Sequence, residues 1–286
     1  MEQRLTAWPE TVETPSGKGA DDENFPVGSI LIARALRPHV ARFYAFARAA
    51  DDIADNPALS SADKIARLDA FEAGLDGSGP EKARRLGESL AETGVPDRHA
   101  RDLLAAFRQD ATKTRYADWA ELIGYCEVSA NPVGRYLMDL HGEDRAWWGP
   151  SDALCTVLQI INHLQDCADD YREMDRVYIP GDWLAEEGLG VDALTASAAA
   201  PGLRRVIDRM LDGCQELLAV ARTAPGRPRA RRLHAEFVVI RTLAERLAAR
   251  LARQDPLAEG VKLSKWDFAV AALTGLGALI SPEGRA

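Results

Sequence analysis

Two aspartate-rich segments, Asp51–Asp55 and Asp166–Asp170, have the residue types and spacing of a metal site. In the first, the carboxylates at 51 and 55 lie four residues apart, so a helix brings them to one face together with Asp52. Like charges at this spacing destabilise an isolated helix by roughly 0.2–0.5 kcal/mol per pair. A bound cation removes this repulsion, and the apolar residues before the cluster argue against an ordinary solvated helix face.

The second segment extends the same pattern over more of one helix. Gln159, Asn162, Asp166 and Asp170 recur at helical spacing and form one polar stripe on an otherwise apolar run. A lone pair of aspartates four apart is a weak signal, but two such pairs in apolar helices are not. The 110 residues between the clusters allow the two helices to face each other across a bundle, where opposed side chains build a metal site.

Magnesium suits these ligands. Mg²⁺ prefers oxygen donors in octahedral geometry and is commonly held by one or two carboxylates plus phosphate oxygens of a substrate. The clusters therefore predict a magnesium-dependent site for a diphosphate ester, with Asp51, Asp55, Asn162, Asp166 and Asp170 as metal ligands. Bound metal assists departure of diphosphate, and apolar walls keep stray water from the carbocation that forms.

Three arginines near the clusters are candidates for substrate binding. Arg48 precedes Asp51 by three residues and orients a carboxylate or meets a phosphate oxygen, although a plain helix salt bridge explains it equally well. Arg172 and Arg176 follow the second cluster and are placed to grip diphosphate, in competition with surface pairing to nearby acids. Gln159 and Asn162 complete the candidate substrate-binding set.

Two tyrosines are candidates for contact with a cation. Tyr44 lies one turn before Arg48 on the same face, and Tyr125 precedes the segment Ser129–Gly134. Either ring stabilises a cation or presents a hydroxyl, while simple packing is the competing explanation. Gly134 is consistent with a close helix approach or with cavity space.

The elements that position these residues are helices. Apolar residues recur at helical spacing almost throughout, and no alternating strand pattern with hairpin turns is found. The sequence predicts an all-α fold: a polar tail over residues 1–23, then one domain over 24–286 with a central active-site cavity. The expected helices are 27–36, 39–55, 61–74, 80–93, 97–111, 118–141 with a break at Pro132, 151–173, 201–223, 228–253 and 265–280.

Composition limits the partners and the compartment. A net charge of −9 argues against nucleic acid as a partner, and four widely spaced cysteines indicate buried thiols in a reducing compartment. The N-terminus does not have the pattern of a signal peptide, so a cytoplasmic protein is expected. The apolar segment Phe268–Ile280 has 13 residues where a span needs about 20. It is either a buried final helix or a helix that docks peripherally on the inner face of the membrane.

At these residues the chain resembles the squalene/phytoene synthase family over about residues 24–280. Asp51–Asp55 resembles the first aspartate motif of the family, and the stripe from Gln159 to Asp170, continued by Arg176–Pro180, resembles the second. Within the family, the segments Glu23–Val27, Phe46–Asp55 and Ser129–Gly134 are most similar to the bacterial hydroxysqualene synthase branch of hopanoid biosynthesis. This resemblance implies an isoprenoid synthase (terpenoid synthase) helical bundle.

The resemblance also implies an activity. The branch converts presqualene diphosphate and water to hydroxysqualene and diphosphate with several Mg²⁺ ions and no NADPH. It implies catalytic roles for the four aspartates at 51, 55, 166 and 170, with Tyr44 and Tyr125 beside them. Gln165 stands where many family members carry Arg, which puts diphosphate contacts carried over at that position in doubt. Asp169 likewise stands where Glu is common.

Two other functions remain as alternatives. One is head-to-head condensation of two prenyl diphosphates, such as farnesyl diphosphate, to presqualene diphosphate, squalene or phytoene. The other is a non-catalytic helical adaptor in which the aspartates are merely exposed. Sequence motifs for zinc proteases, serine hydrolases, dinucleotide binding and P-loop nucleotide binding are not found in the 286 residues.

Overall fold

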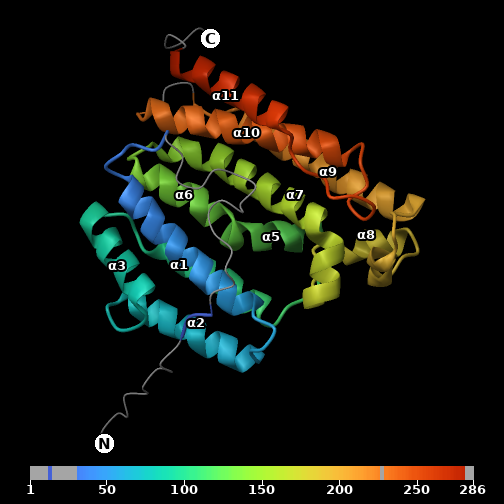
Figure 1. Ribbon diagram of the computed structural model, residues 1–286, viewed down its shortest axis with the longest axis horizontal. Coiled ribbons are helices and arrows are strands. Elements are labelled where there is room, and N and C mark those ends of the chain that lie inside the picture. The colour runs from blue at the N-terminus through green and yellow to red at the C-terminus, as the bar shows by residue number, and fades with distance from the viewer. Residues whose placement is uncertain (1–11, 15–30, 226–228, 281–286) are drawn as a thin grey trace, which may run out of the picture. The chain divides into compact units, whose positions relative to one another are not determined.

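The computed structural model describes residues 12–14, 31–225 and 229–280. The chain divides into two compact units, residues 1–28 with 35–112 and residues 29–34 with 113–286. The described residues form helices and turns, with one isolated β-bridge between Arg115 and Val177 (Figure 1). The predicted all-α class is confirmed, and the prediction of a single domain over 24–286 stays a prediction.

The described part of the first unit is built from four helices, drawn in blue to teal in Figure 1. They are α1 (Arg37–Asp55), α2 (Ser61–Leu75), α3 (Glu81–Thr93) and α4 (Arg98–Asp110). α1 packs against each of the other three, which explains why its sequence is so apolar. Pro38 lies in the first turn of α1, where its missing N–H costs nothing.

The apolar face of α1 is anchored by side chains with no solvent exposure. Phe46 and Ile53 are fully buried, and the Phe46 ring lies 5.7 Å from the ring of Phe71 on α2. Burial of each such side chain contributes about 1.5–3 kcal/mol. Lys64 of α2 donates to the carbonyl oxygen of Ala54 at 2.7 Å and so satisfies one backbone acceptor at the end of α1. This packing fixes the helix end that carries the first aspartate cluster.

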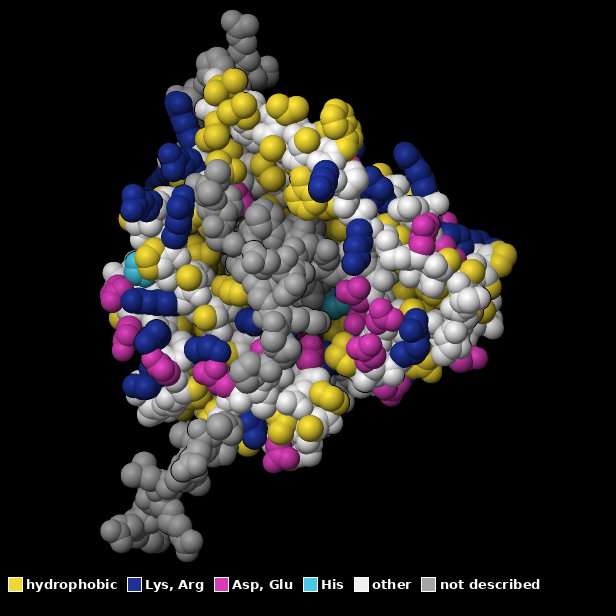
Figure 2. Space-filling view, in the orientation of Figure 1, with side chains coloured by type: hydrophobic (Ala, Val, Ile, Leu, Met, Phe, Trp, Pro, Cys, Tyr) yellow, Lys and Arg dark blue, Asp and Glu magenta, His cyan; other side chains and the backbone are white. Residues whose placement is uncertain are grey.

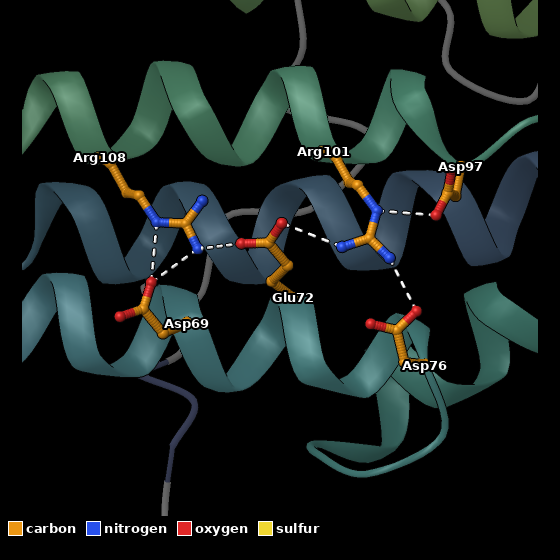
Figure 3. A network of polar contacts seen from close by, with 6 residues as sticks. All are labelled: Asp69, Glu72, Asp76, Asp97, Arg101 and Arg108. Atoms are coloured by element: carbon orange, nitrogen blue, oxygen red, sulfur yellow. Dashed lines mark hydrogen bonds and ion pairs between the residues drawn. The ribbon is translucent and has the colours of Figure 1, made fainter.

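An ion-pair network joins α2 to α4 beside this packing (Figure 3). Glu72 is its centre, because it accepts from Arg101 at 3.0 Å and from Arg108 at 2.6 Å. Burial alone would raise the pKa of Glu72, but the two arginine hydrogen bonds outweigh it and lower the pKa. The outer members are Asp69, Asp76 and Asp97.

Three residues of the N-terminal segment are held against the first unit. Arg67 donates to the carbonyl oxygen of Val12 at 2.8 Å, and Lys82 pairs with Glu13. The Thr14 hydroxyl donates to the carbonyl oxygen of Asp52 at 3.1 Å. The polar tail over residues 1–23 stays a prediction, and within it residues 12–14 contact the helices of the first unit. The rest of the predicted tail and the motif at 23–27 lie outside the described residues.

The second unit contains the remaining helices and is organised around one long helix. The helices are α5 (Trp119–Ser129), α6 (Asn131–Leu140), α7 (Trp148–Met174), α8 (Gly181–Glu186), α9 (Pro201–Ala221), α10 (Arg231–Leu251) and α11 (Lys265–Ile280), with 3-10 turns at Arg145–Trp147 and Val191–Thr195. α7 packs against α5, α6, α9 and α10. The buried side chains of its middle turns, Val157, Ile160, Ile161 and Leu164, have no solvent exposure.

Gly134 sets the distance between α6 and α7. A Cβ atom at this position would lie 2.3 Å from the Ser151 hydroxyl and 2.8 Å from the Cys155 sulfur, closer than real Cβ contacts. The glycine is therefore required for close helix approach, which decides between the two explanations that the sequence left open. All four cysteines are free, and all but the half-buried Cys155 are buried.

Most predicted helices are present, with three differences. Residues 31–36 form turns, so the predicted helix over 27–36 is wrong for these residues, and 27–30 lie outside the described range. The helix predicted over 118–141 breaks at Ala130 rather than at Pro132, because Pro132 occupies the first turn of α6. The segment between the helices predicted over 151–173 and 201–223, for which no helix was predicted, contains the short α8 and a 3-10 turn.

Candidate active site

The first aspartate cluster occupies the last turn of α1. Asp51 and Asp55 are half-buried, while Asp52 is 8% exposed. The carboxyl end of a helix carries partial negative charge, and this helix has no basic residue in its last turn. Three carboxylates at such a helix end add negative charge where the partial negative charge of the backbone already disfavours it. This arrangement is expected of a cation site.

Arg48 is the cation that the helix itself supplies to the cluster. Its guanidinium lies 3.2 Å from a carboxylate oxygen of Asp51 and donates to Asp52 at 2.7 Å. The shorter contact is to the more deeply buried carboxylate, so Arg48 neutralises chiefly Asp52. Both expectations for Arg48, carboxylate orientation and helix ion pairing, are met by one geometry. Its contact with a phosphate oxygen stays a prediction.

Ionisation of the Asp51 carboxyl is disfavoured in the folded protein. Burial and, after it, the nearby charge of Asp55 raise the pKa of Asp51 to about 8 against the opposing effect of Arg48. Asp110, the last residue of α4, adds a smaller effect in the same direction as Asp55. Because the side chain is 35% exposed, solvent screens part of this effect. A divalent cation bound here stabilises the ionised carboxylates that the helix otherwise disfavours.

The donor set fits magnesium shared with a substrate. Among the described residues, no group of three or more His, Cys, Asp or Glu side chains is arranged to hold a metal ion alone. Mg²⁺ does not require such a group, because it is commonly held by one or two carboxylates, waters and substrate phosphates. Asp51 and Asp55 would supply two oxygen ligands, and a bound cation would relieve the repulsion between their carboxylates. The residues present therefore fit a magnesium–diphosphate complex.

The second cluster lies on the exposed stripe of α7. Gln159, Asn162 and Asp170 are half-buried and Asp166 is exposed, whereas the apolar residues between them, Ile160, Ile161, Leu164, Cys167 and Ala168, are buried. The polar stripe predicted from the sequence is therefore the accessible face of the helix. α7 ends at Asp175 in a left-handed conformation with φ of 51°, which turns the chain directly after the cluster.

A group of aromatic rings, here called the ring cluster, lies beside this stripe. It consists of Tyr116, Tyr125, His163 and Tyr178. The imidazole of His163 stacks on the Tyr178 ring with 3.4 Å between centroids, and Tyr125 lies 5.5 Å from Tyr178. Lys113 lies 4.6 Å above the ring of Tyr116. Electron-rich ring faces of this kind stabilise positive charge.

His163 ties the ring cluster to the polar stripe. Its Nε2 lies 3.1 Å from the Gln159 amide nitrogen, which donates if this ring nitrogen is the unprotonated one. Burial lowers the pKa of His163 to about 3, and the positive charge of Arg176 acts in the same direction. The imidazole is therefore neutral at physiological pH and accepts the hydrogen bond that orients Gln159.

Backbone pairing between two distant segments builds the ring cluster. Val177 donates to the carbonyl oxygen of Thr114 at 2.9 Å, and Gly181 donates to that of Tyr116 at 2.9 Å. Arg115 pairs with Asp175 and secures the turn after α7. This pairing brings Tyr116 against Tyr178, with 5.4 Å between their stacked rings.

The predicted substrate-binding residues have different surroundings. Arg176 is 6% exposed, so its side chain is buried rather than at the surface. Arg172, in contrast, pairs with Asp169 at 3.2 Å, and both side chains are more than half exposed. The competing explanation of surface pairing thus describes Arg172 but not Arg176.

Other predicted residues are placed as follows. Tyr125 is 4% exposed and belongs to the ring cluster, whereas Tyr44 is half-buried on α1. Gln165 donates to the carbonyl oxygen of Val261 at 2.5 Å and so holds the segment before α11. This bond gives Gln165 a structural role at the position where a contact with diphosphate was in doubt.

Several residues of the site were not found from the sequence. Asp110 acts on Asp51 only through the packing of α4 on α1, and Tyr116 meets Tyr178 only through the backbone pairing. His163 had a usable signal, because it follows Gln159 by four residues and so shares its helix face. Tyr178 is buried between Val177 and Ile179, and nothing in this local sequence predicts its ring contacts.

Comparison with solved structures defines the class of protein. The fold is that of the all-α isoprenoid synthases. The crystal structure of squalene synthase from Alicyclobacillus acidocaldarius matches with a TM-score of 0.69 and 33% identity, over 80% of this chain and 87% of that one. A dehydrosqualene synthase structure matches with a TM-score of 0.75 over 91% of this chain and 92% of that one, and at 18% identity it shows the fold alone.

The chain belongs to the squalene/phytoene synthase family and is an enzyme of that family, whose model matches residues 19–267. It is 44% identical to the hydroxysqualene synthase of Rhodopseudomonas palustris over 94% of this chain and 92% of the relative. It is 42% identical to the hydroxysqualene synthase of Zymomonas mobilis over 87% of this chain and 86% of the relative. The family expected from the sequence is confirmed, and the adaptor alternative is not supported.

Proposed function

We propose that the protein converts presqualene diphosphate and water to hydroxysqualene and diphosphate in a magnesium-dependent reaction. The observation that carries this proposal is the 40 to 44% identity to three proteins named hydroxysqualene synthase. The crowded carboxylates on α1 support the metal requirement. The reaction breaks the carbon–oxygen bond to diphosphate, forms one to water and releases a proton, so no reductant is needed.

We propose that both aspartate clusters serve one metal–diphosphate complex. Asp51 and Asp55 of α1, with Asp166, Asp170 and Asn162 of α7, supply the oxygen ligands. When bound by these residues, Mg²⁺ would supply the positive charge that neutralises the departing diphosphate. Arg48 pairs with Asp52 and holds its carboxylate in place, so that the neighbouring carboxylates are left to the metal. Arg172, on the exposed end of α7, is proposed as a contact for the diphosphate once its partner Asp169 releases it.

We propose that the ring cluster stabilises the carbocation. Tyr125 and Tyr178 supply electron-rich rings 5.5 Å apart, and the neutral His163 adds no repulsive positive charge. The hydrogen bond from the Gln159 amide nitrogen to His163 fixes the orientation of the Gln159 side chain. Its amide oxygen is then left to accept a hydrogen bond from a single water. Tyr44, on α1 one turn before Arg48, is proposed as a further contact for the reacting cation.

A product assay tests this function directly. Purified protein is supplied with Mg²⁺ and presqualene diphosphate, without NADPH, and the lipid products are analysed by mass spectrometry. We expect hydroxysqualene, with its hydroxyl oxygen labelled when the reaction runs in ¹⁸O-water. Failure to turn over presqualene diphosphate under these conditions rejects the proposed reaction.

A second reaction has a specific observation in its favour. The solved structure at 33% identity is that of a squalene synthase, an enzyme named for a different product from that of the hydroxysqualene synthases. Condensation of two farnesyl diphosphates, or reduction of the cation by NADPH, is therefore tested in parallel. Formation of presqualene diphosphate or squalene from these substrates, without hydroxysqualene from presqualene diphosphate, assigns the chain to this second reaction.

A further inference from the structure

α11 is buried on one side and exposed on the other, and its exposed side is apolar. Its buried positions Asp267, Ala271 and Gly275 recur every four residues and face α10. Large side chains on the outer side of the helix, Trp266, Leu273, Leu276 and Ile280, are 69%, 66%, 53% and 73% exposed. From Phe268 to Ile280 the helix carries no charged side chain. An ordinary surface helix has a polar outer face, so this one needs another explanation.

The apolar side chains are concentrated rather than scattered. Of the large hydrophobic residues exposed in the described part of the chain, all but Val133 and Val220 lie on α11. Figure 2 shows them as a yellow patch along this helix at the top of the view. Single exposed apolar residues are normal on a soluble protein, but a continuous patch marks an interaction surface.

The patch is presented by a helix that is firmly held. Asp267 is 1% exposed and accepts from Arg250 of α10 at 2.6 Å, and it also pairs with Arg246. A Cβ atom at Gly275 would lie 2.4 Å from Val239 of α10, so the two helices are in close contact. The exposed face is therefore a fixed feature of the folded helix pair and not the product of fraying.

Positive charge gathers at the beginning of the same helix. A cavity of about 430 Å³ is lined by Arg246, Arg250 and Arg253 together with Asp267, which leaves two positive charges there. Lys265, the first residue of α11, is exposed. The chain as a whole carries a charge of −9, so a positive region beside the apolar patch runs against its overall composition. Positive charge beside apolar surface complements an anionic lipid bilayer.

We propose that α11 docks the protein on the surface of an anionic membrane. The helix lies in the plane of the interface, with its outer apolar side chains among the acyl chains and the Arg253 end among the headgroups. A Trp at the edge of an apolar face is suited to this boundary. In the described part of the chain, no helix has the length and apolarity to cross a bilayer, so contact is peripheral. The family match ends at residue 267, so most of the outer apolar face lies beyond it.

Vesicle flotation of the full-length protein tests the proposal. Vesicles of phosphatidylcholine alone are compared with vesicles that also contain phosphatidylglycerol. We expect the protein to float with the anionic vesicles and to be released by about 0.5 M salt, which screens the headgroup contacts. Replacement of Leu273 and Leu276 by Ser should lower the partition coefficient at least about 100-fold. Replacement of Arg253 and Lys265 by Gln should lower it roughly 30-fold on anionic vesicles.

Val220→Ser is the matched control, because Val220 is 45% exposed on α9 and lies outside the patch. It should leave flotation unchanged. Thermal unfolding of each variant confirms that it is folded, and the charge variants retain the whole apolar face. Absence of flotation by the parent, or equal flotation with neutral vesicles, overturns the proposal. A dimer in solution that the leucine variants dissociate assigns the face to a second copy and also overturns it.

Discussion

The two aspartate clusters lie on helices of similar apolar character but have different neighbours. On α1 the carboxylates crowd one another and are relieved by Arg48 from the same helix. On α7 the carboxylates extend a stripe of amides that is backed by the ring cluster. The first cluster thus carries negative charge that Arg48 offsets only in part, whereas the second places oxygen donors beside aromatic rings. We therefore propose that α1 serves mainly the metal, and that α7 serves both the metal and the reacting hydrocarbon.

The largest expected effect comes from removing one carboxylate of either cluster. Asp51→Asn and Asp166→Asn should each lower kcat at least about 100-fold, because each removes an oxygen ligand at a site of developing charge. Steady-state turnover at saturating Mg²⁺ measures this. Asp169→Asn is the matched control on α7, since Asp169 is exposed and pairs only weakly with Arg172. A loss as large for Asp169→Asn as for Asp166→Asn would contradict the assignment.

Arg48 should matter more for stability than Arg172, the exposed arginine beside the second cluster. Arg48→Met removes the positive charge held 2.7 Å from the 8%-exposed Asp52, and we expect a loss of about 2–3 kcal/mol in the free energy of unfolding. Arg172→Met breaks a pair in solvent and should change it by less than about 0.5 kcal/mol. Urea unfolding of both variants gives the comparison. Equal free energies of unfolding for Arg48→Met and Arg172→Met would show that the α1 carboxylates do not depend on Arg48 for charge compensation.

The stability of the protein should depend on pH through Asp51 of the α1 cluster. The pKa of Asp51 is raised from 3.8 to about 8 in the folded protein. Its protonated carboxyl therefore contributes to the stability of the fold fully below about pH 4, and this contribution is lost as pH rises through 8. Without Mg²⁺, unfolding between pH 5 and pH 8 should show a decline of about 1–2 kcal/mol from this group.

Asp51→Asn and added Mg²⁺ should each reduce this decline, the first by removing the charge and the second by compensating it. The same series on Asp166→Asn serves as the comparison, because Asp166 is exposed. If both variants retain the parent's slope, the raised pKa of Asp51 is not the source of the decline.

The smallest effect is expected at Gln165. Its side chain bonds to the carbonyl oxygen of Val261, so Gln165→Ala should cost about 1 kcal/mol of stability and change the affinity for diphosphate less than about twofold. Gln159→Ala, on the polar stripe, should instead lower kcat. Calorimetric titration with a diphosphate analogue and turnover assays separate the two. A large loss of diphosphate affinity in Gln165→Ala would instead show that Gln165 contributes to diphosphate binding.

Local chemistry made the helices and the aspartate clusters predictable. The spacing of Asp51 and Asp55 and the run of apolar residues before them are sufficient to place both carboxylates at the end of one helix. The stripe from Gln159 to Asp170 was equally readable, because helical periodicity assigns it to one face. The turns at 31–36 were missed since short apolar runs are compatible with several local structures.

Contacts between segments distant in sequence were not predictable. The ring cluster depends on pairing between residues 114–117 and 177–182, and no local pattern specifies this partner. The effect of Asp110 on Asp51 requires the packing of α4 on α1. For α11, periodicity left a buried helix and a docking helix as alternatives. The structure shows one face buried against α10 and the other exposed, because α10 covers a single side.

Binding of a magnesium–diphosphate complex is the most direct test of the central claim, which is that the clusters on α1 and α7 serve one metal site. Isothermal titration with a non-hydrolysable prenyl diphosphate analogue is performed on the parent, Asp51→Asn, Asp166→Asn and the double variant. We expect tight binding that requires Mg²⁺ in the parent and a loss of at least about tenfold in each single variant. A double variant that binds the analogue as tightly as the parent would contradict the account.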